Sequence, residues 1–327
     1  MRVRARLTTA TAGLATALAA VTSLSGCMTV HGETAVVPAL TEGEAERAFE
    51  HYVETSNEAL ETYDPELNAT VETGPLGAIR DAELTARHEV TPEGAINYEP
   101  LEFTDARFHI PQQAGWPKYF AVDARTAQDT ENRWLLIFTR DGIKEEWAVS
   151  YLTVLAADDF PELAEDGDGF LEDIPVEGDT HSGLALEPGE LSAAYAEYLS
   201  SEGDGPFTEG PYTTDALAAR EEANSQPEFI TEFRDRAAED EAYAPVALRT
   251  ADGGALVLFT SLYHEKRTMA PNEPLVVDPL VEALMDAPAE QALTMEWVVT
   301  QAALVPEGEG DIEIVGRVAG VITAGGE

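Results

Sequence analysis

Hydrophobic and polar positions divide this chain into stretches of helical period and stretches of strand period. A helix is predicted from Thr41, because Thr41 and Glu44 form a capping box and the residues that follow have one apolar face. That face consists of Ala45, Phe49, Tyr52, Val53, Leu60 and Tyr63. The helix should end before Asp64-Pro65, and a shorter one is predicted over residues 76–88.

From residue 97 the apolar residues alternate with polar ones, which predicts strands. The predicted strands cover residues 101–110, 116–123, 133–140 and 147–155. Turn residues such as Asp141-Gly142 separate them, so neighbouring strands should pair antiparallel. Helices followed by an antiparallel meander are typical of the α+β class.

The second half of the chain repeats this order. A helix should follow Pro188, and a second helical region is predicted over residues 213–239, divided at Pro227, with Phe229, Ile230 and Phe233 on the apolar face of its later part. Strands are predicted over residues 243–250, 255–264, 292–305 and 312–323, with a short helix opened by Asp278-Pro279. We therefore predict an α+β fold of two successive units. Each should have helices followed by a curved antiparallel sheet, in the style of the cystatin and nuclear-transport-factor-like folds.

The N-terminus has the order of a lipoprotein signal. Arg2, Arg4 and Arg6 precede an apolar run, and the run ends in Leu24-Ser25-Gly26-Cys27. Cleavage between Gly26 and Cys27 would leave Cys27, the one cysteine of the chain, as an N-terminal residue that carries diacylglyceryl and fatty acyl chains such as palmitate. Two chains anchor a protein stably. We expect an exported protein on the outer face of the cytoplasmic membrane.

These signals divide the chain into five parts. They are a signal peptide (1–26), a lipidated tether (27–40), a first α+β domain (41–157), an acidic linker (158–183) and a second α+β domain (184–327). The linker holds ten Asp or Glu and little periodicity, so the two domains are expected to be separable.

The net negative charge of the chain limits the classes of partner that it can bind. The chain has 62 acidic and 19 basic residues and a formal net charge of −43. Phosphates would be repelled, which excludes nucleic acid, and the body should not lie flat on anionic lipid.

Several short stretches resemble a family of lipoproteins from actinomycetes. The resemblance begins with the run 26–33 and continues in Glu72-Thr73-Gly74-Pro75-Leu76-Gly77-Ala78-Ile79. Phe103-Thr104-Asp105, Gln113-Ala114-Gly115-Trp116-Pro117 and Asn132-Arg133-Trp134-Leu135 add to it. It covers nearly the whole mature chain. Since that family has no assigned activity, it implies an envelope location and supplies no site residues.

Catalytic signatures are absent from the sequence. Ser182 lacks the glycine that a nucleophile elbow has two places earlier, and neither His88-Glu89 nor His264-Glu265 continues into a zinc-binding motif. We therefore expect no enzyme activity and no cofactor.

The closest approach to a metal motif lies in the acidic linker. Asp166, Asp168 and Glu172, with Glu177 at position twelve, are candidates for weak calcium binding. Leu171 stands where a calcium loop needs glycine, so a solvated acidic segment is the favoured interpretation.

Two further places are candidate ligand sites. Trp116 closes a turn before Pro117, where it is a candidate stacking platform for a ligand, although a packing role is favoured. Asp105, Arg107 and His109 alternate on one strand and should share a face. An Asp and a His inside a cone-shaped pocket would suit acid–base chemistry, against the favoured alternative of a solvent-facing salt-linked row.

The sequence thus predicts a membrane-anchored lipoprotein with a non-catalytic binding role at the cell envelope. Its partner would be another envelope protein or a cell-wall component. The alternatives are a small-ligand binder that serves a transporter and an enzyme with a cone-shaped pocket.

Overall fold

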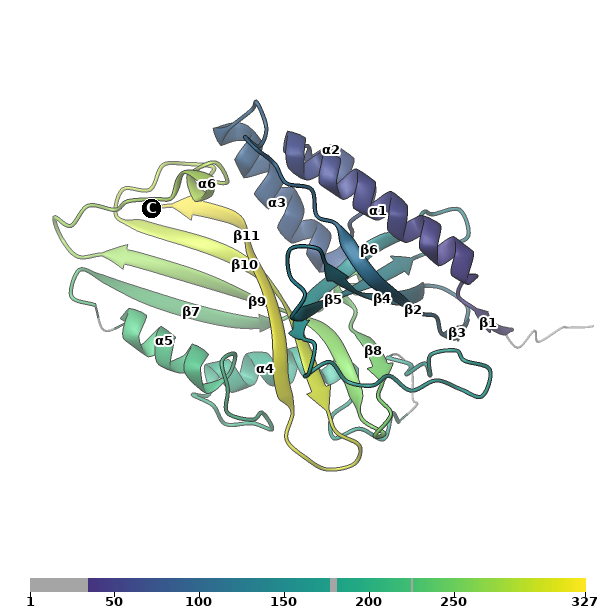
Figure 1. Cartoon of the computed structure of the whole chain (residues 1–327). Coiled ribbons are helices and arrows are strands. Elements are labelled where there is room, and N and C mark those ends of the chain that lie inside the picture. The colour runs from purple at the N-terminus through teal and green to yellow at the C-terminus, as the bar shows by residue number, and fades with distance from the viewer. Residues whose placement is uncertain (1–34, 177–180, 225) are drawn as a thin grey trace, which may run out of the picture. The chain divides into compact units, whose positions relative to one another are not determined.

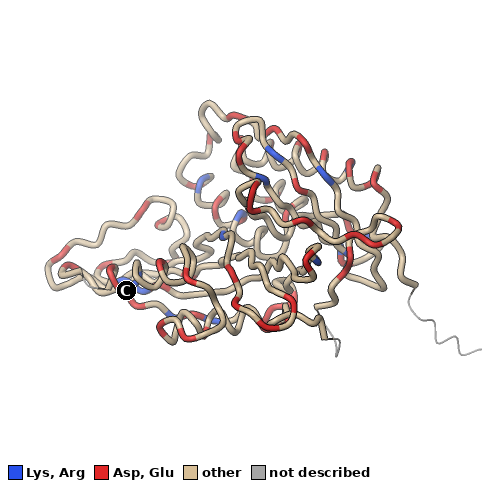
Figure 2. The backbone as a smooth tube through the Cα atoms, turned by 60° about the horizontal axis from the view of Figure 1, so that its bottom comes forward, with Lys and Arg blue, Asp and Glu red and all other residues tan. Residues whose placement is uncertain are grey.

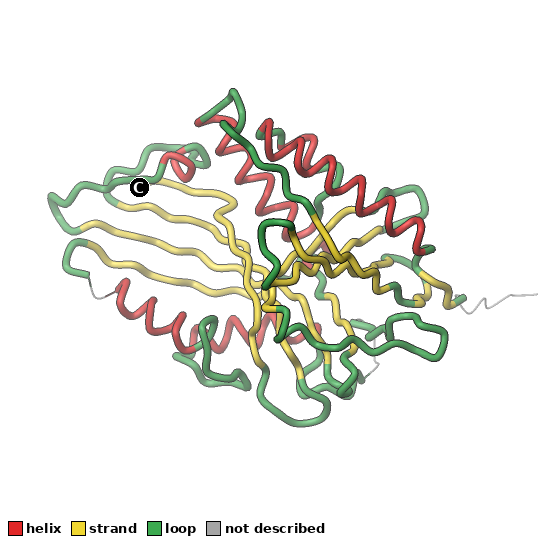
Figure 3. The backbone as a smooth tube through the Cα atoms, in the orientation of Figure 1, coloured by secondary structure: helices red, strands yellow, loops and turns green. Residues whose placement is uncertain are grey.

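The computed structural model describes residues 35–176, 181–224 and 226–327, and residues 36–327 form one compact unit (Figure 1). Helices and antiparallel sheets follow one another in two successive units, which confirms the α+β class. Figure 3 shows helices packed along the two main sheets, with loops at their ends.

The first unit places three helices before its sheet. The helices are α1 (Glu42–Thr62), α2 (Pro65–Asn68) and α3 (Gly74–Val90). The sheet has the order β2-β4-β5-β6, with β2 (Phe103–His109), β4 (Lys118–Thr126), β5 (Asn132–Arg140) and β6 (Ala148–Ala156). The predicted capping box of α1 is present, with the Thr41 backbone N–H 2.8 Å from Glu44 Oε2. Its apolar stripe packs Phe49 and Tyr52 against Phe138 of the sheet.

The second unit has the order β11-β10-β9-β7, and β8 also pairs with β9. Its strands are β7 (Phe229–Ala237), β8 (Val246–Arg249), β9 (Ala255–Met269), β10 (Ala292–Val305) and β11 (Glu313–Gly326). Its helices are η1 (Pro188–Glu190), α4 (Leu191–Ser200), α5 (Thr214–Asn224), η2 (Glu241–Tyr243) and α6 (Pro279–Glu282). Asp278 caps α6 as predicted, because its carboxylate accepts the backbone N–H of Leu280 at 2.8 Å.

The prediction of a helix over the later part of 213–239 is wrong. Residues Phe229–Ala237 form β7, which pairs antiparallel with the second half of β9. Phe229, Thr231 and Phe233 alternate with the more exposed Ile230 and Glu232, as a strand at the edge of a sheet requires. A short apolar segment can fit the period of a helix and also that of a strand. Here it forms a strand, because it then pairs with backbone groups of β9 that would otherwise lack partners.

The predicted tether 27–40 extends too far into the folded part of the chain. Val36–Pro38 form β1, which pairs with β3 (Gln112–Ala114), and Leu40 is buried in the first core. Residues 1–34, which include the signal peptide and Cys27, lie outside the described residues.

The acidic segment predicted as a linker packs against both sheets over most of its described length. Leu171 and Ile174 are buried, and isolated bridges join Leu171 to Pro111 of the first unit and Asp173 to Leu248 of β8. One hydrophobic cluster also contains residues of both sheets and of this segment. It consists of Tyr119, Ala121, Leu135, Ile137, Tyr151, Leu155, Leu171, Val246, Leu248, Leu256, Leu258 and Ala302.

Strand β11 completes the junction of the two units. Helix α3 packs against both β6 and β11. At Gly320 on β11, a Cβ would lie 2.5 Å from Cγ2 of Ile79 on α3, so only glycine permits this approach. The two successive units are therefore packed together through shared apolar contacts.

Candidate functional site

A cleft of about 840 Å³ opens beside the first sheet. Its walls come from β2, β4 and β5, from the segment 157–165, and from the β8–β9 turn at 249–253. Volumes of this size are typical of small-molecule sites. The cleft is therefore the candidate functional site.

The floor of the cleft holds a buried aspartate between a histidine and an arginine. Asp123 on β4 is 1% exposed, and its Oδ2 lies 2.6 Å from Nε2 of His109 on β2. Arg133 on β5 donates its Nε–H to the other carboxylate oxygen of Asp123. Adjacent antiparallel strands bring the three side chains together, since β4 lies between β2 and β5. Both carboxylate oxygens are thereby satisfied away from water.

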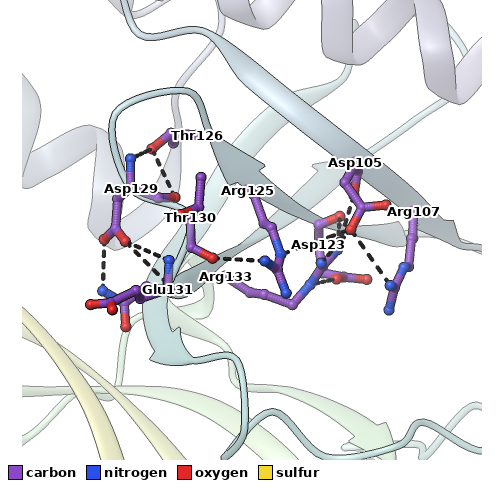
Figure 4. A network of polar contacts seen from close by, with 10 residues as sticks. Asp105, Arg107, Asp123, Arg125, Thr126, Asp129, Thr130, Glu131 and Arg133 are labelled. Carbon is purple, nitrogen blue, oxygen red and sulfur yellow. Dashed lines mark hydrogen bonds and ion pairs between the residues drawn. The ribbon is translucent and has the colours of Figure 1, made fainter.

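A β-bulge in β2 brings a second aspartate to Arg133. The register of β2 and β4 shifts between Thr104 and Arg107, and Asp105 in the bulge has φ of 50°. Arg133 Nη1 donates to Asp105 Oδ2 at 2.8 Å, and the Arg107 guanidinium lies 3.6 Å from the same oxygen (Figure 4). The hydrogen bond from Arg133 and the nearby charge of Arg107 hold the pKa of Asp105 below its usual range.

The positive charges of two arginines in the cleft are not fully neutralised by carboxylates. Arg107 reaches the network only through Asp105, and its side chain is 59% exposed (Figure 4). Arg249 donates to the backbone carbonyls of Gly253 at 2.8 Å and Ser182 at 3.0 Å, and among the described residues it has no carboxylate partner. Figure 2 shows how few Lys and Arg stand among the many Asp and Glu of this chain. Two such guanidinium groups in one cleft can bind an anionic group.

The segment that follows β6 contributes acidic residues to the cleft. Glu162, Glu165 and Glu172 line the cleft together with Phe160 and Leu163. The site therefore offers both guanidinium groups and carboxylates, and the backbone of Arg249 pairs with the segment that carries Glu162 and Glu165. A ligand that carries both an anionic and a cationic group would complement it.

The sequence predicted only some of the residues of this site. Arg107 and His109 both line the cleft, whereas the bulge turns Asp105 toward Arg133. Sequence reasoning missed Asp123, Arg133 and Arg249. Asp123 and Arg133 were detectable as charged residues that follow or precede apolar runs on β4 and β5, where burial requires a partner of opposite charge.

The calcium candidates remain spread out in the structure. Asp166 Oδ1 accepts the backbone N–H groups of Asp168 at 2.9 Å and Phe170 at 3.0 Å, and Oδ2 accepts from Gln112 at 3.2 Å. Glu172 lines the cleft, and Glu177 lies outside the described residues. No group of three or more His, Cys, Asp or Glu in the described part of the chain is arranged to hold a metal ion. Calcium binding stays a prediction.

The candidate ligand platform Trp116 is not among the residues that line the cleft. Trp116 is 42% exposed, with the Arg140 guanidinium 5.4 Å and Lys118 Nζ 5.8 Å from its ring centroid. These cation–π contacts hold the indole on the surface beside β3.

A second buried carboxyl lies at the start of α3. Glu72 accepts from Tyr52 Oη at 3.2 Å and Asn68 Nδ2 at 2.9 Å, and Arg80 Nε lies 3.6 Å away. Burial raises the pKa of Glu72, and burial likewise raises the pKa of Asp173 and of Glu265.

These groups predict how stability changes with pH. A carboxyl whose pKa is raised in the folded state favours folding when protonated, so its contribution is present at low pH and is lost as pH rises through that pKa. Carboxyls whose pKa is lowered, such as Asp105 and Asp166, lose their contribution only below the pKa of about 3.9 that aspartate has in an unfolded chain. The melting temperature should therefore rise as pH falls from 7 toward 5.

Glu72→Gln should flatten this pH dependence, because it removes the proton that the folded state takes up. Thermal melts at pH 5, 6 and 7 measure it, and Glu50→Gln on the exposed face of α1 is the control. Parallel pH profiles for wild type and Glu72→Gln would contradict the assignment.

Comparison with known proteins places the chain among lipoproteins. A family model described as "Domain of unknown function (DUF8094)" matches residues 36–326. An uncharacterised lipoprotein of Streptomyces avermitilis is 43% identical over 319 residues, which cover 96% of this chain and 94% of that protein. Two uncharacterised lipoproteins of Streptomyces coelicolor are 41% identical, with 96% and 95% covered, and 24% identical, with 88% and 83% covered. None of the described helices is long and apolar enough to cross a membrane.

Proposed function

We propose a binding function at the cell envelope for this chain, which belongs to the DUF8094 family and to the exported lipoproteins that its Streptomyces relatives represent. The lipid on Cys27 would hold the protein at the outer face of the cytoplasmic membrane. The cleft would bind a cell-wall component that carries carboxylate and amino groups. The proposal rests on Arg107 and Arg249, which line the same cleft. Arg107 has one carboxylate contact at 3.6 Å, and Arg249 donates to backbone carbonyls.

The shape of the site favours a small or extended ligand over a folded partner. Protein interfaces of ordinary size are broad and nearly flat, whereas ligands of a few hundred daltons bind in concave sites. A peptidoglycan fragment, in which a sugar carries a short peptide with carboxylates and a free amine, matches the two kinds of charge in the cleft. Glu162, Glu165 and Glu172 would face the amine, and the arginines would face a carboxylate.

The binding of a soluble disaccharide–tetrapeptide from digested peptidoglycan tests the proposal. By titration calorimetry, Arg107→Gln and Arg249→Gln should each weaken binding by about 10- to 100-fold, because a charge-assisted hydrogen bond contributes about 1.5–3 kcal/mol. Arg47→Gln is the matched control, since it removes the same charge from the exposed face of α1. Arg133 is unsuited to this test because its guanidinium is part of the buried network.

Equal affinity in wild type and both cleft variants would contradict the site. If the fragment does not bind, pull-downs of wild type and Arg249→Gln from envelope extracts distinguish the alternative partner class, another envelope protein. If wild type retains a protein that Arg249→Gln does not, the cleft remains the binding site, and its partner is an envelope protein instead of a cell-wall component.

One observation favours an enzyme as the second candidate function. His109 is only 14% exposed and is oriented by Asp123, the arrangement that general-base catalysis uses. Of the residues that line the cleft, Thr250 has the only hydroxyl, and that hydroxyl donates to Asp252 Oδ1 at 2.6 Å, so water would be the nucleophile. Release of a cleaved fragment by wild type but not by His109→Gln would support an enzyme, and an intact fragment in both would support binding alone.

A further inference from the structure

An exposed apolar edge lies where the described chain begins. Of the nine exposed large apolar side chains in the described residues, four belong to β1, to the turn that follows β3 and to the β5–β6 turn. They are Val36 (61% exposed), Val37 (45%), Trp116 (42%) and Ile143 (76%). Trp116 is also the one exposed ring among the four tryptophans, all of which are described.

Hydrogen bonds and cation–π contacts connect these side chains into one surface. Lys118 Nζ donates to the backbone carbonyls of Gln113 at 2.8 Å and Val37 at 3.5 Å, and it lies over the Trp116 ring. Arg140 also lies over that ring, 5.4 Å from its centroid, and donates from Nε to the Gly142 carbonyl at 3.0 Å and from Nη2 to the Ile143 carbonyl at 2.5 Å. The two cations thus tie β1, Trp116 and the β5–β6 turn together. We call the surface formed by Val36, Val37, Trp116, Arg140 and Ile143 the β1 edge; Lys118, which is 6% exposed, helps to hold it together.

The position of Cys27 in the sequence limits how far this edge can lie from a bilayer. Nine residue steps separate Cys27 from Val36. They span about 30 Å at full extension and about 17 Å as a flexible coil. A body of 292 residues has a radius of gyration of about 19 Å, so its far side lies beyond that average reach. In Figure 1, β1 and β3 lie at one end of the folded part and the C-terminus lies near the other.

We propose that the β1 edge rests on the bilayer that holds the lipid anchor, with Trp116 and Ile143 at the depth of the headgroups. This contact rests on the anchoring of Cys27 in the function proposed above and is independent of the ligand in the cleft. Tryptophan prefers the membrane interface because its ring is apolar and its N–H is polar. Arg140 would contact phosphates while its aliphatic stem covers apolar surface, whereas Lys118 is 6% exposed and stays on the carbonyls of Gln113 and Val37.

Carboxylates around the edge restrict the contact to its apolar residues. Glu145 and Glu146 follow Ile143 in the β5–β6 turn, and Asp166 lies beside β3 through its hydrogen bond with Gln112. These charges would be repelled by an anionic surface. The contact should therefore be stronger on zwitterionic than on anionic vesicles at low salt, and salt should reduce the difference through screening.

Fluorescence quenching by brominated lipid tests the proposal on the full lipidated chain. The protein is reconstituted into phosphatidylcholine vesicles with bromine on the acyl chains, and mass spectrometry of its N-terminus verifies the lipid on Cys27. Quenching should fall about threefold in Trp116→Phe, because buried rings away from the interface meet little bromine. The Trp297→Phe variant, whose substitution lies on β10 of the other sheet, should be quenched as strongly as wild type.

A second pair of variants separates membrane contact from local structure. Ile143→Asp should reduce the quenching of Trp116 while the protein still sediments with the vesicles. Ile96→Asp should have no effect, although Ile96 is 84% exposed, because it lies after α3 and outside the β1 edge. Full sedimentation with equal quenching in wild type and Trp116→Phe would overturn the contact and leave the anchor intact. An unmodified Cys27 would overturn the contact together with the anchor, while peptidoglycan binding by the cleft would be unaffected.

Discussion

Arg133→Met should lower the free energy of unfolding by about 3–5 kcal/mol, because breaking a buried ion pair leaves the other charge uncompensated. Asp123 is 1% exposed and would keep only His109, 2.6 Å away, as a side-chain partner. Asp105 would also lose the hydrogen bond that Arg133 donates at 2.8 Å. Urea denaturation at pH 7, followed by circular dichroism, measures the loss.

Two further variants make this result specific to the buried network. Arg236→Met removes an ion pair with Glu296 whose arginine is 45% exposed, so the cost should stay within about 1 kcal/mol. The double variant Arg133→Met/Asp123→Leu should recover most of the loss, since apolar side chains can replace both charges. A cost below that of Arg236→Met would contradict the network.

Leu135→Ala and Leu256→Ala should each destabilise the whole body, by about 2–5 kcal/mol. Leu135 lies on β5 and Leu256 on β9, both are fully buried, and both belong to the cluster that joins the two sheets. Because the cluster is shared, either variant should shift a single unfolding transition. Amide hydrogen exchange should accelerate in β4–β6 and in β9–β10 alike.

Exchange that accelerates only in the sheet carrying the substitution would contradict this result. It would favour the organisation expected from the sequence, in which residues 41–157 and 184–327 fold separately around an acidic linker. Expression of the two fragments is a direct check: if each unfolds cooperatively alone, the shared cluster contributes little to stability.

Local signals account for what the sequence predicted well. Thr41 and Glu44 mark the start of α1 through contacts within one turn, and Asp278 does the same for α6. Alternating apolar residues located the strands of both main sheets except β7, because the side-chain period of a strand is a local property. The residues 229–237 were assigned wrongly, since their partner β9 begins 18 residues after β7 ends.

The candidate site was only partly visible for a related reason. His109 and Arg107 were predicted as members of an alternating polar row on one strand. The other residues of the network, Asp123 and Arg133, lie on neighbouring strands. The bulge at Asp105 then redirects one member of the row toward Arg133. A bulge depends on how two strands pair, so alternation along one strand does not reveal it.

By itself, the sequence predicted a lipoprotein signal ending at Cys27, and it determined the charge of −43, the α+β class and the order of most helices and strands. Each follows from neighbouring residues or from composition. Only the tertiary structure decided that the acidic segment packs between the sheets, that Asp123 joins His109 to Arg133, and that Trp116 and Ile143 share an edge with β1. These depend on contacts between residues distant in the chain, whose register and burial are settled when the sheets pack.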